Sequence, residues 1–273
     1  MRGGGGSHLG LGVSAAIIRA GEWAVAIACV GLPAWAEDSP ATRSGWEAGA
    51  QLSRYHYEEP GTMWLEGTRL GASGAYTAVT PRRTFARLEG RLSYGKLEYE
   101  GSGVMTNVPD YSVEVRLLAG RDYAAGSMVW SPYAGGGYRY LYNDLRGVTS
   151  TGAIGYRRES NYFYLPLGVT LRMPLREGWA LAPQLEYDVF VRGVQRSYLS
   201  DTGLGFGDAS NQQNSGYGYR VQVMFEGPRW TISPWMHYWK VKDSDLQPVG
   251  LGIVVYEPEN WTREAGIELR YRF

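Results

Sequence analysis

The chain has little cysteine and histidine, and its charges cancel. Its 273 residues include one Cys and three His, and 27 Lys and Arg residues balance 27 Asp and Glu residues. A single cysteine excludes a disulfide framework, and so few Cys and His residues leave no spacing typical of zinc ligands. A chain without a basic excess is unlike a nucleic-acid-binding protein. We therefore expect no metal, no cofactor and no nucleic-acid partner.

Long hydrophobic runs are also missing. Outside one short stretch near the N-terminus, the sequence has no charge-free apolar run of about 18 residues, which excludes a membrane protein built from helices. Glycine, tyrosine and tryptophan are abundant, with 38, 21 and 10 residues. Hydrophobic residues make up 44% of the chain, which is too high for a disordered protein. This composition indicates an all-β protein.

Residues 1–36 have the features of a secretory signal peptide. Arg2 and Arg19 provide positive charge, and residues 23–32 (WAVAIACVGL) form a short apolar core. Residues 34–36 (AWA) match the A-x-A pattern that precedes a cleavage site. The apolar core is too short to span a bilayer. We therefore predict that this segment is cleaved during export.

The mature chain would then comprise residues 37–273, which contain no cysteine. A cysteine-free exported chain suits an oxidising compartment. Two other interpretations of the N-terminal segment are open. One makes it a strand or helix of the folded protein. The other makes Cys29 a lipid-modified residue, against which Ala26 argues, because a large aliphatic residue is typical three positions before such a cysteine.

From residue 44 onward, polar and apolar residues alternate in segments separated by breaks. Alternation with a period of two is typical of β-strands whose two faces meet different surroundings. Each segment is long enough for the roughly 9–11 residues that a tilted strand needs to cross a bilayer. We predict ten strands, at residues 44–57, 63–79, 83–99, 111–123, 127–143, 161–174, 179–195, 216–226, 230–242 and 262–273.

The predicted connections alternate in length. The short ones comprise residues 80–82, 124–126, 175–178 and 227–229. The others are mostly longer and comprise residues 58–62, 100–110, 144–160, 196–215 and 243–261. Outer-membrane barrels have this asymmetry, with tight periplasmic turns and longer external loops. An even number of strands places the two ends of such a barrel on the same, periplasmic side.

The two faces of the predicted strands differ in chemistry. In the last strand, one face carries Ala265, Ile267, Leu269, Tyr271 and Phe273, whereas the other carries charged residues and a glycine. The apolar faces end in tyrosine or tryptophan, as an aromatic girdle at a lipid–water boundary does. A soluble lipocalin-like barrel is the alternative, but it would need an apolar lumen. We therefore predict an antiparallel up-and-down transmembrane β-barrel of about ten strands.

The last strand, with Leu269, Tyr271 and Phe273, resembles the C-terminal signal that Gram-negative outer-membrane barrels present to the barrel-assembly machinery. Residues 131–139 (SPYAGGGYR) and 164–168 (YLPLG) are similar to phrases of the same superfamily. The chain thus resembles a small outer-membrane β-barrel protein over about residues 44–273. This resemblance implies an outer-membrane location, contact with lipid and lipopolysaccharide, and the assembly machinery as a partner. It implies no particular activity.

The polar faces of the strands would line a narrow lumen. Arginine is more frequent there than lysine, which suits two-pronged pairing with carboxylates, and charges in a tight lumen must be paired. We favour an ion-pair network that fills the barrel; the alternative is the lining of a narrow, weakly anion-selective channel. The predicted network comprises Glu47, Arg69, Arg87, Glu89, Arg91, Glu114, Arg116, Asp122, Arg139, Arg172, Glu186, Asp188, Arg192, Arg220, Glu268, Arg270 and Arg272.

A hydrolase at the barrel rim is a third interpretation. Omptin proteases, which resemble this chain in strand count, use an Asp–Asp pair and an Asp–His pair near the external rim. Here His56 lies close to Glu58, and His237 lies between two tryptophans, where an interfacial position is expected. A His–carboxylate pair is the minimum for general-base catalysis. Because Ser53 and His56 are three apart on one strand, they point to opposite faces. We therefore predict no catalytic residues and no enzymatic activity.

External loops are where such a protein would bind a ligand. The predicted third loop contains Arg146, Arg157 and Arg158, whose guanidinium groups suit lipopolysaccharide phosphates. The predicted fifth loop contains an apolar run, residues 249–256 (VGLGIVVY), which we expect to form a hairpin above the membrane or a lid over the lumen. The predicted function is thus that of a surface protein, either structural or binding through its loops.

Overall fold

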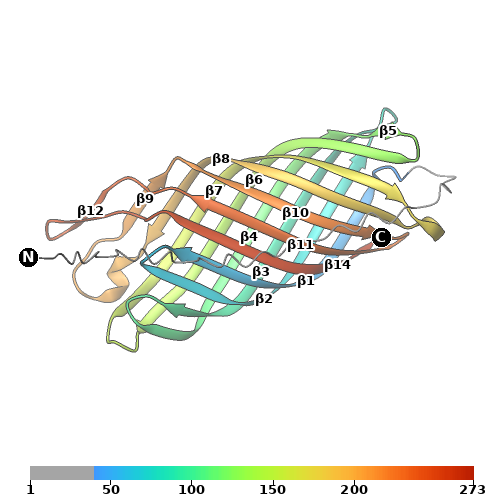
Figure 1. Cartoon of the computed structure of the whole chain (residues 1–273). Coiled ribbons are helices and arrows are strands. Elements are labelled where there is room, and N and C mark those ends of the chain that lie inside the picture. The colour runs from blue at the N-terminus through green and yellow to red at the C-terminus, as the bar shows by residue number, and fades with distance from the viewer. Residues whose placement is uncertain (1–39) are drawn as a thin grey trace, which may run out of the picture. The chain divides into compact units, whose positions relative to one another are not determined.

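The computed structural model describes residues 40–273, and the predicted signal peptide lies outside these residues. Ten long antiparallel strands form a closed barrel (Figure 1), as predicted. They are β1 (Gly45–Glu59), β2 (Met63–Val79), β3 (Thr84–Glu100), β4 (Val104–Arg121), β6 (Met128–Val148), β7 (Ile154–Pro174), β8 (Ala180–Ser197), β10 (Gly216–Glu226), β11 (Trp230–Val241) and β14 (Asn260–Arg272).

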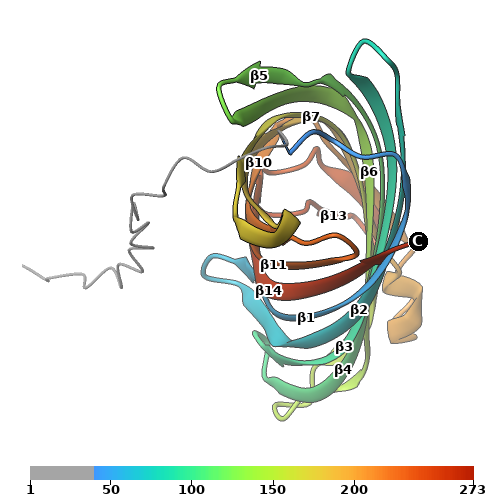
Figure 2. The same cartoon turned by 90° about the vertical axis from the view of Figure 1, so that its right-hand side faces the viewer.

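The barrel closes between its first and last strands. Leu52 of β1 lies opposite Ile267 of β14, and β14 pairs on its other side with β11. The remaining strands pair with their neighbours in sequence, so each long strand has two partners. A closed sheet leaves no edge whose N–H and C=O groups would lack partners in lipid. Figure 2 looks into the barrel from the end where the C-terminus lies.

Short elements complete the structure at both ends. At the C-terminal end of the barrel, β5 (Tyr123–Ala125) pairs with β6, and a 3₁₀ turn, η1 (Arg176–Gly178), connects β7 to β8. At the opposite end, η2 (Leu199–Thr202) and β9 (Ala209–Gln213) lie between β8 and β10, and β12 (Gln247–Gly250) pairs with β13 (Ile253–Val255). No helix in the described part of the chain is long and apolar enough to cross a membrane.

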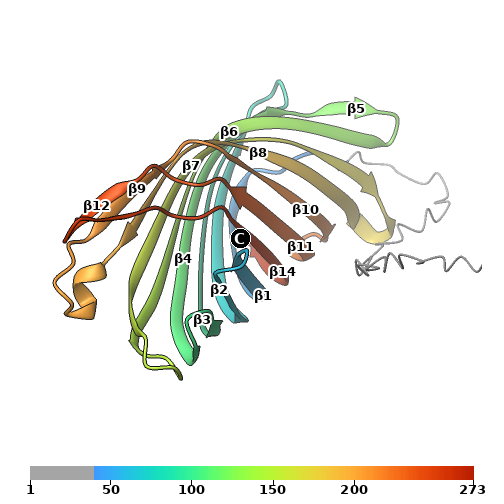
Figure 3. The ribbon, with the colours of Figure 1, turned by 60° about the vertical axis from the view of Figure 1, so that its left-hand side comes forward.

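The strands on the external side are longer than predicted. Strand β4 begins at Val104, β6 continues to Val148, and β7 begins at Ile154. Two of the expected long loops are therefore short turns, at residues 101–103 and 149–153. The sequence pattern missed these extensions because a strand beyond the bilayer needs no apolar face. The β12–β13 hairpin extends beyond the barrel at this end (Figure 3), as one of the two interpretations of the fifth loop predicts.

An apolar band surrounds the outside of the barrel. Leu117 and Leu185 are 60% and 59% exposed on this face. Trp46, Tyr76 and Trp230 lie on the outer face near the end of the barrel that carries the C-terminus. Toward the other end, tyrosines such as Tyr111, Tyr219 and Tyr238 stack on neighbouring rings. The band and its aromatic borders match the lipid-facing surface of an outer-membrane barrel.

Candidate functional site

The predicted charge network lies in the lumen, with one exception. Its members are buried or half-buried side chains on the inner face of the strands. Arg192 instead lies exposed on the outer face. Strand β8 has an extra residue here, because Phe163 pairs with Arg192 while Tyr164 pairs with Phe190. This bulge reverses the alternation after Phe190, so the expectation of Arg192 in the lumen is wrong.

In the middle of the lumen, two arginines bind three carboxylates. Arg116 bonds to Glu89 and, through Nη1, to Glu186 Oε1 at 2.5 Å. Arg220 Nε lies 3.2 Å from the same Glu186 oxygen, and Arg220 Nη2 lies 2.9 Å from Glu114 Oε1. The network thus connects strands on opposite sides of the barrel. Removing one member of such a network would leave its partners buried without a counter-charge, which is strongly destabilising.

Nearer the end of the barrel that carries the C-terminus, arginines of β3 and β14 surround Glu47. Glu47 accepts a bond from Arg87 Nη2 at 2.7 Å and another from Arg272. Arg270 Nη2 lies 2.6 Å from Glu268 Oε2 and its Nη1 lies 3.7 Å from Glu47. Paired carboxylates and guanidinium groups therefore line this part of the wall. They face the lumen, where a bound ligand would contact them.

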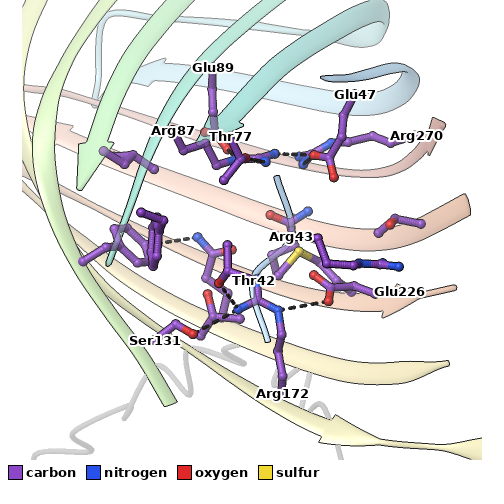
Figure 4. A pocket seen from close by; sticks show the side chains of 18 of the residues that line it. Thr42, Arg43, Glu47, Thr77, Arg87, Glu89, Ser131, Arg172, Glu226 and Arg270 are labelled. Carbon is purple, nitrogen blue, oxygen red and sulfur yellow. Dashed lines mark hydrogen bonds and ion pairs between the residues drawn. The ribbon is translucent and has the colours of Figure 1, made fainter. Parts of the chain in front are cut away.

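The residues before β1 close part of this end. Thr42 donates through its backbone N and its Oγ1 to Asp122, at 2.8 and 2.7 Å. Arg172 donates to Thr42 Oγ1 and Ser131 Oγ, both at 3.0 Å, and to Glu226 (Figure 4). The segment therefore lies across the mouth of the lumen, attached to strands far from β1 in sequence. Beneath it is a polar hollow with about 700 Å³ of empty space, its opening included.

Toward the external end, packed side chains fill the lumen. One buried cluster comprises Tyr55, Tyr57, Met63, Leu65, Leu97, Val108 and Leu145. A second comprises Leu141, Tyr162, Tyr164, Phe190, Trp239 and Val241. Within the second, Trp239 lies 5.0 Å from the Tyr164 ring centroid and 6.2 Å from that of Tyr162. Sequence reasoning missed these clusters, because they need inward aromatic residues from several strands at one level.

His237 lies beside the second cluster, in the lumen. It is 3% exposed, so the expectation of an interfacial histidine is wrong. Its Nε2 lies 3.1 Å from Asp188 Oδ2, and its Nδ1 lies 3.3 Å from Arg220 Nη2. Because arginine only donates, Nδ1 accepts and Nε2 carries the proton that it donates to Asp188. Burial closes this His–Asp pair to substrate.

His56 lies on the outer face, as its position opposite to Ser53 predicts. Its Nδ1 is 2.8 Å from Glu66 Oε2, and its Nε2 is 3.3 Å from Glu58. Its ring stacks between Trp64 and Trp261, with centroids 6.4 and 4.9 Å away. The described residues place no hydroxyl or thiol within hydrogen-bond distance of either ring nitrogen. A histidine held this way is part of the aromatic girdle.

A buried ion triad lies above the aromatic clusters. Arg158 Nη2 bonds to Glu59 Oε1 at 2.5 Å and to Glu257 of the fifth loop. Tyr57 donates to both carboxylates, at 2.7 and 3.1 Å. Burial, together with the neighbouring Glu59, raises the pKa of Glu257 to about 7. The base of the fifth loop is therefore attached to the barrel by a carboxyl group that titrates near neutral pH.

The other two arginines predicted to face lipopolysaccharide also have partners within the protein. Arg157 Nε lies 2.8 Å from Asp201 Oδ2, and Arg146 Nη2 lies 2.6 Å from Asp144 Oδ2. The first pair connects β7 to η2, and the second joins two residues of β6. Contact with lipopolysaccharide stays a prediction.

Several network residues escaped the prediction. Asp110, which pairs with Arg69, belonged to an expected loop that is strand in the structure. Glu264 lies on the same face as Glu268 and is 5% exposed, so the alternation of β14 could have identified it. Within residues 40–273, no group of three or more His, Cys, Asp or Glu side chains is placed to hold a metal ion.

Leu269 and Tyr271 of the expected assembly signal lie on the outer face of β14, and Phe273 follows the strand. Leu269 and Phe273 are 46% and 77% exposed, and Tyr271 contacts Trp230 edge to face with 4.8 Å between ring centroids. Their side chains are thus available on the barrel surface, whereas recognition by the assembly machinery stays a prediction.

Comparisons with known proteins agree with the architecture. A family model described as "Outer membrane protein beta-barrel domain" matches residues 23–189. The outer membrane protease OmpT from Escherichia coli is similar in structure, with a TM-score of 0.53, 13% identity, and coverage of 86% of this chain and 100% of that chain. At this identity the likeness shows the fold alone.

Two further solved structures show lower similarity. Neisserial surface protein A has a TM-score of 0.34 and 10% identity, over 84% of this chain and 98% of that chain. The attachment invasion locus protein Ail of Yersinia pestis has a TM-score of 0.33 and 12% identity, over 85% of this chain and 100% of that chain. No curated protein matches the chain.

Replacing Arg116 with Ala should destabilise the barrel by about 3–5 kcal/mol, because Glu89 and Glu186 would stay buried without their cation. The matched control is Arg146→Ala: the Arg116 side chain is 6% exposed and the Arg146 side chain 54%. The control should change stability far less, because the exposed Arg146 pair is screened by solvent. Urea titration of the detergent-solubilised protein measures both. Equal losses in the two variants would contradict a stabilising network.

Attachment of the fifth loop should weaken as pH rises. The pKa of Glu257 is about 7 in the folded protein and 4.5 ordinarily, so the stabilising proton is fully present below about pH 4.5 and is lost as pH rises through 7. Proteolysis of residues 243–259 should therefore be up to about seventyfold faster at roughly pH 8 than at pH 5, after correction for protease activity. Glu257→Gln should remove this dependence; an unchanged pH profile in that variant would refute the assignment.

Proposed function

The chain belongs to the outer membrane protein beta-barrel domain family, and from this premise we propose that it is a non-enzymatic surface protein that binds a partner through its external end. The outer membrane is its location. The observation that carries the proposal is the packed external half of the lumen. We expect a barrel that is filled there to conduct no ions. Its exposed strand ends and hairpins are then the surface through which it would bind a partner outside the cell.

The filled lumen argues against the channel alternative. The side chains of Tyr162, Tyr164 and Trp239 are 1–2% exposed, so they leave no continuous aqueous path between them. The Arg158 triad adds a second layer of buried groups above them. An anion would have to displace both layers to cross. The arginine excess of the lower lumen therefore does not favour conduction.

The hydrolase alternative has little support from the two histidine sites. His237 and Asp188 form a suitable pair, but they are 3% and 0% exposed beneath the aromatic cluster. His56 is accessible but is held by carboxylates and tryptophans on the lipid-facing side. General-base catalysis needs a base within reach of the proton that it removes from a bound substrate or water. Neither histidine meets this requirement.

The external end exposes apolar side chains that a binding role would use. On and beside the β12–β13 hairpin, Leu246, Leu251 and Val254 are 65%, 74% and 58% exposed. On the β6–β7 hairpin, Val148 and Ile154 are 64% and 44% exposed. Apolar groups above the membrane gain free energy when a partner covers them. Their position at the external end of the barrel, on these two hairpins, supports contact with a surface outside the cell.

We expect the folded protein to be silent in planar bilayers, because the external clusters block the lumen. The double variant Tyr162→Ala/Trp239→Ala should open steady conductance by removing two rings of the second cluster. The control is Tyr238→Ala, which removes a ring from the outer face and should stay silent. Steady openings of the unaltered protein would refute the proposal.

Replacing Leu251 and Val254 with Ser should reduce retention of protein-expressing bacteria on a polystyrene surface by several-fold. The matched control changes Val148 and Ile154 to Ser on the other hairpin and should retain more of the adhesion. Surface display of both variants is first equalised by antibody labelling. Equal retention of the unaltered protein and the Leu251/Val254 variant would contradict binding through the fifth loop.

A further inference from the structure

The polar hollow near the C-terminal end extends deep into the lumen. Its outer part is lined by residues that include Arg43, Arg87 and Arg172, and a second, narrower hollow, with about 370 Å³ of empty space including its opening, adjoins it. The two share Glu89, Gln222 and Arg270 in their walls. Figure 4 shows the charged side chains that point into the outer part from both sides. Together they form a pocket that is open at one end, since the external half of the lumen is packed.

Two arginines of this pocket have no carboxylate partner. The guanidinium of Arg91 lies 4.2 Å from the ring centroid of Trp235 and forms no ion pair with any described residue. Arg43 at the mouth donates to the carbonyl oxygens of Gly227 and Pro228, at 2.8 and 3.2 Å, and likewise has no ion pair within residues 40–273. Every other arginine in the pocket wall bonds to a glutamate.

Further donors around the pocket are left without partners. Gln222 is 5% exposed, lines both hollows, and has no partner for its Nε2. Arg270 Nε and Arg272 Nη1 are also unpaired. An unpaired buried donor costs free energy that a hydrogen-bond acceptor in the pocket would recover. The donors of this wall would thus be satisfied by a hydrogen-bond acceptor that carries negative charge.

We propose that the pocket binds a small oxyanion, a phosphate or carboxylate group, that enters from the periplasmic end. The planar guanidinium of Arg91 offers two parallel N–H groups that fit two oxygens of such a group, and Trp235 holds the guanidinium in place. Arg43 attracts the anion at the mouth. Because the external half is filled, the anion is retained rather than conducted. This inference is independent of the proposed surface-binding role.

The test measures phosphate binding to the protein extracted from outer membranes in a mild detergent. Isothermal titration with inorganic phosphate at constant ionic strength, set with chloride, should show saturable binding of one phosphate for each chain. Succinate in a parallel titration shows whether a carboxylate serves as well. Arg91→Gln should weaken phosphate binding by about ten- to a hundredfold, as expected for the loss of charged hydrogen bonds.

The matched control is Arg192→Gln, which removes an exposed arginine of the outer face and should leave the affinity unchanged. Arg43 lies outside the strands, so Arg43→Gln tests the same pocket if Arg91→Gln does not fold. Arg43→Gln should weaken phosphate binding by several-fold. Heat-modifiable migration on gels verifies folding of each variant. Absence of saturable binding to the unaltered protein, or equal affinity in the Arg91 or Arg43 variant and the Arg192 variant, would overturn the proposal.

Discussion

The requirement that every backbone N–H and C=O group in a bilayer be hydrogen-bonded within the protein governs this structure. Pairing of β1 with β14 meets it by removing both edges of the sheet. Once the sheet is closed, alternate side chains must face lipid or lumen, and the apolar set goes outside. The polar and charged set is thereby forced into an interior that ten strands make narrow. The remaining features of the protein follow from how that interior is filled.

The lumen is filled in two different ways along its length. In the external half, aromatic rings such as Tyr162 and Trp239 pack together and exclude water. In the periplasmic half, arginines and glutamates pair across the barrel but leave a hollow. Packed rings need no partner beyond their neighbours, whereas charged groups need partners at short distance. A packed outer end and a hollow inner end therefore coexist in one barrel.

The external end combines firm attachment with exposed apolar surface. Arg158 holds the base of the fifth loop through Glu257, and Arg157 holds η2 through Asp201. These pairs come from segments that are far apart in sequence. The hairpin tip beyond them, with Leu251 at 74% exposure, is left free. A rigid base and an apolar tip are a suitable arrangement for contact with a surface outside the cell.

The sequence alone determined the strand number, the two faces of each strand and most of the lumen charges, because all three depend on alternation with a period of two. It could not reveal where alternation breaks, as at the bulge that turns Arg192 outward, or continues past the membrane, as at Asp110. Nor could it show that Trp239 and Tyr162 meet, or that Arg91 lacks a carboxylate partner. Those facts depend on register and on contacts across the lumen, which exist only once the barrel is closed.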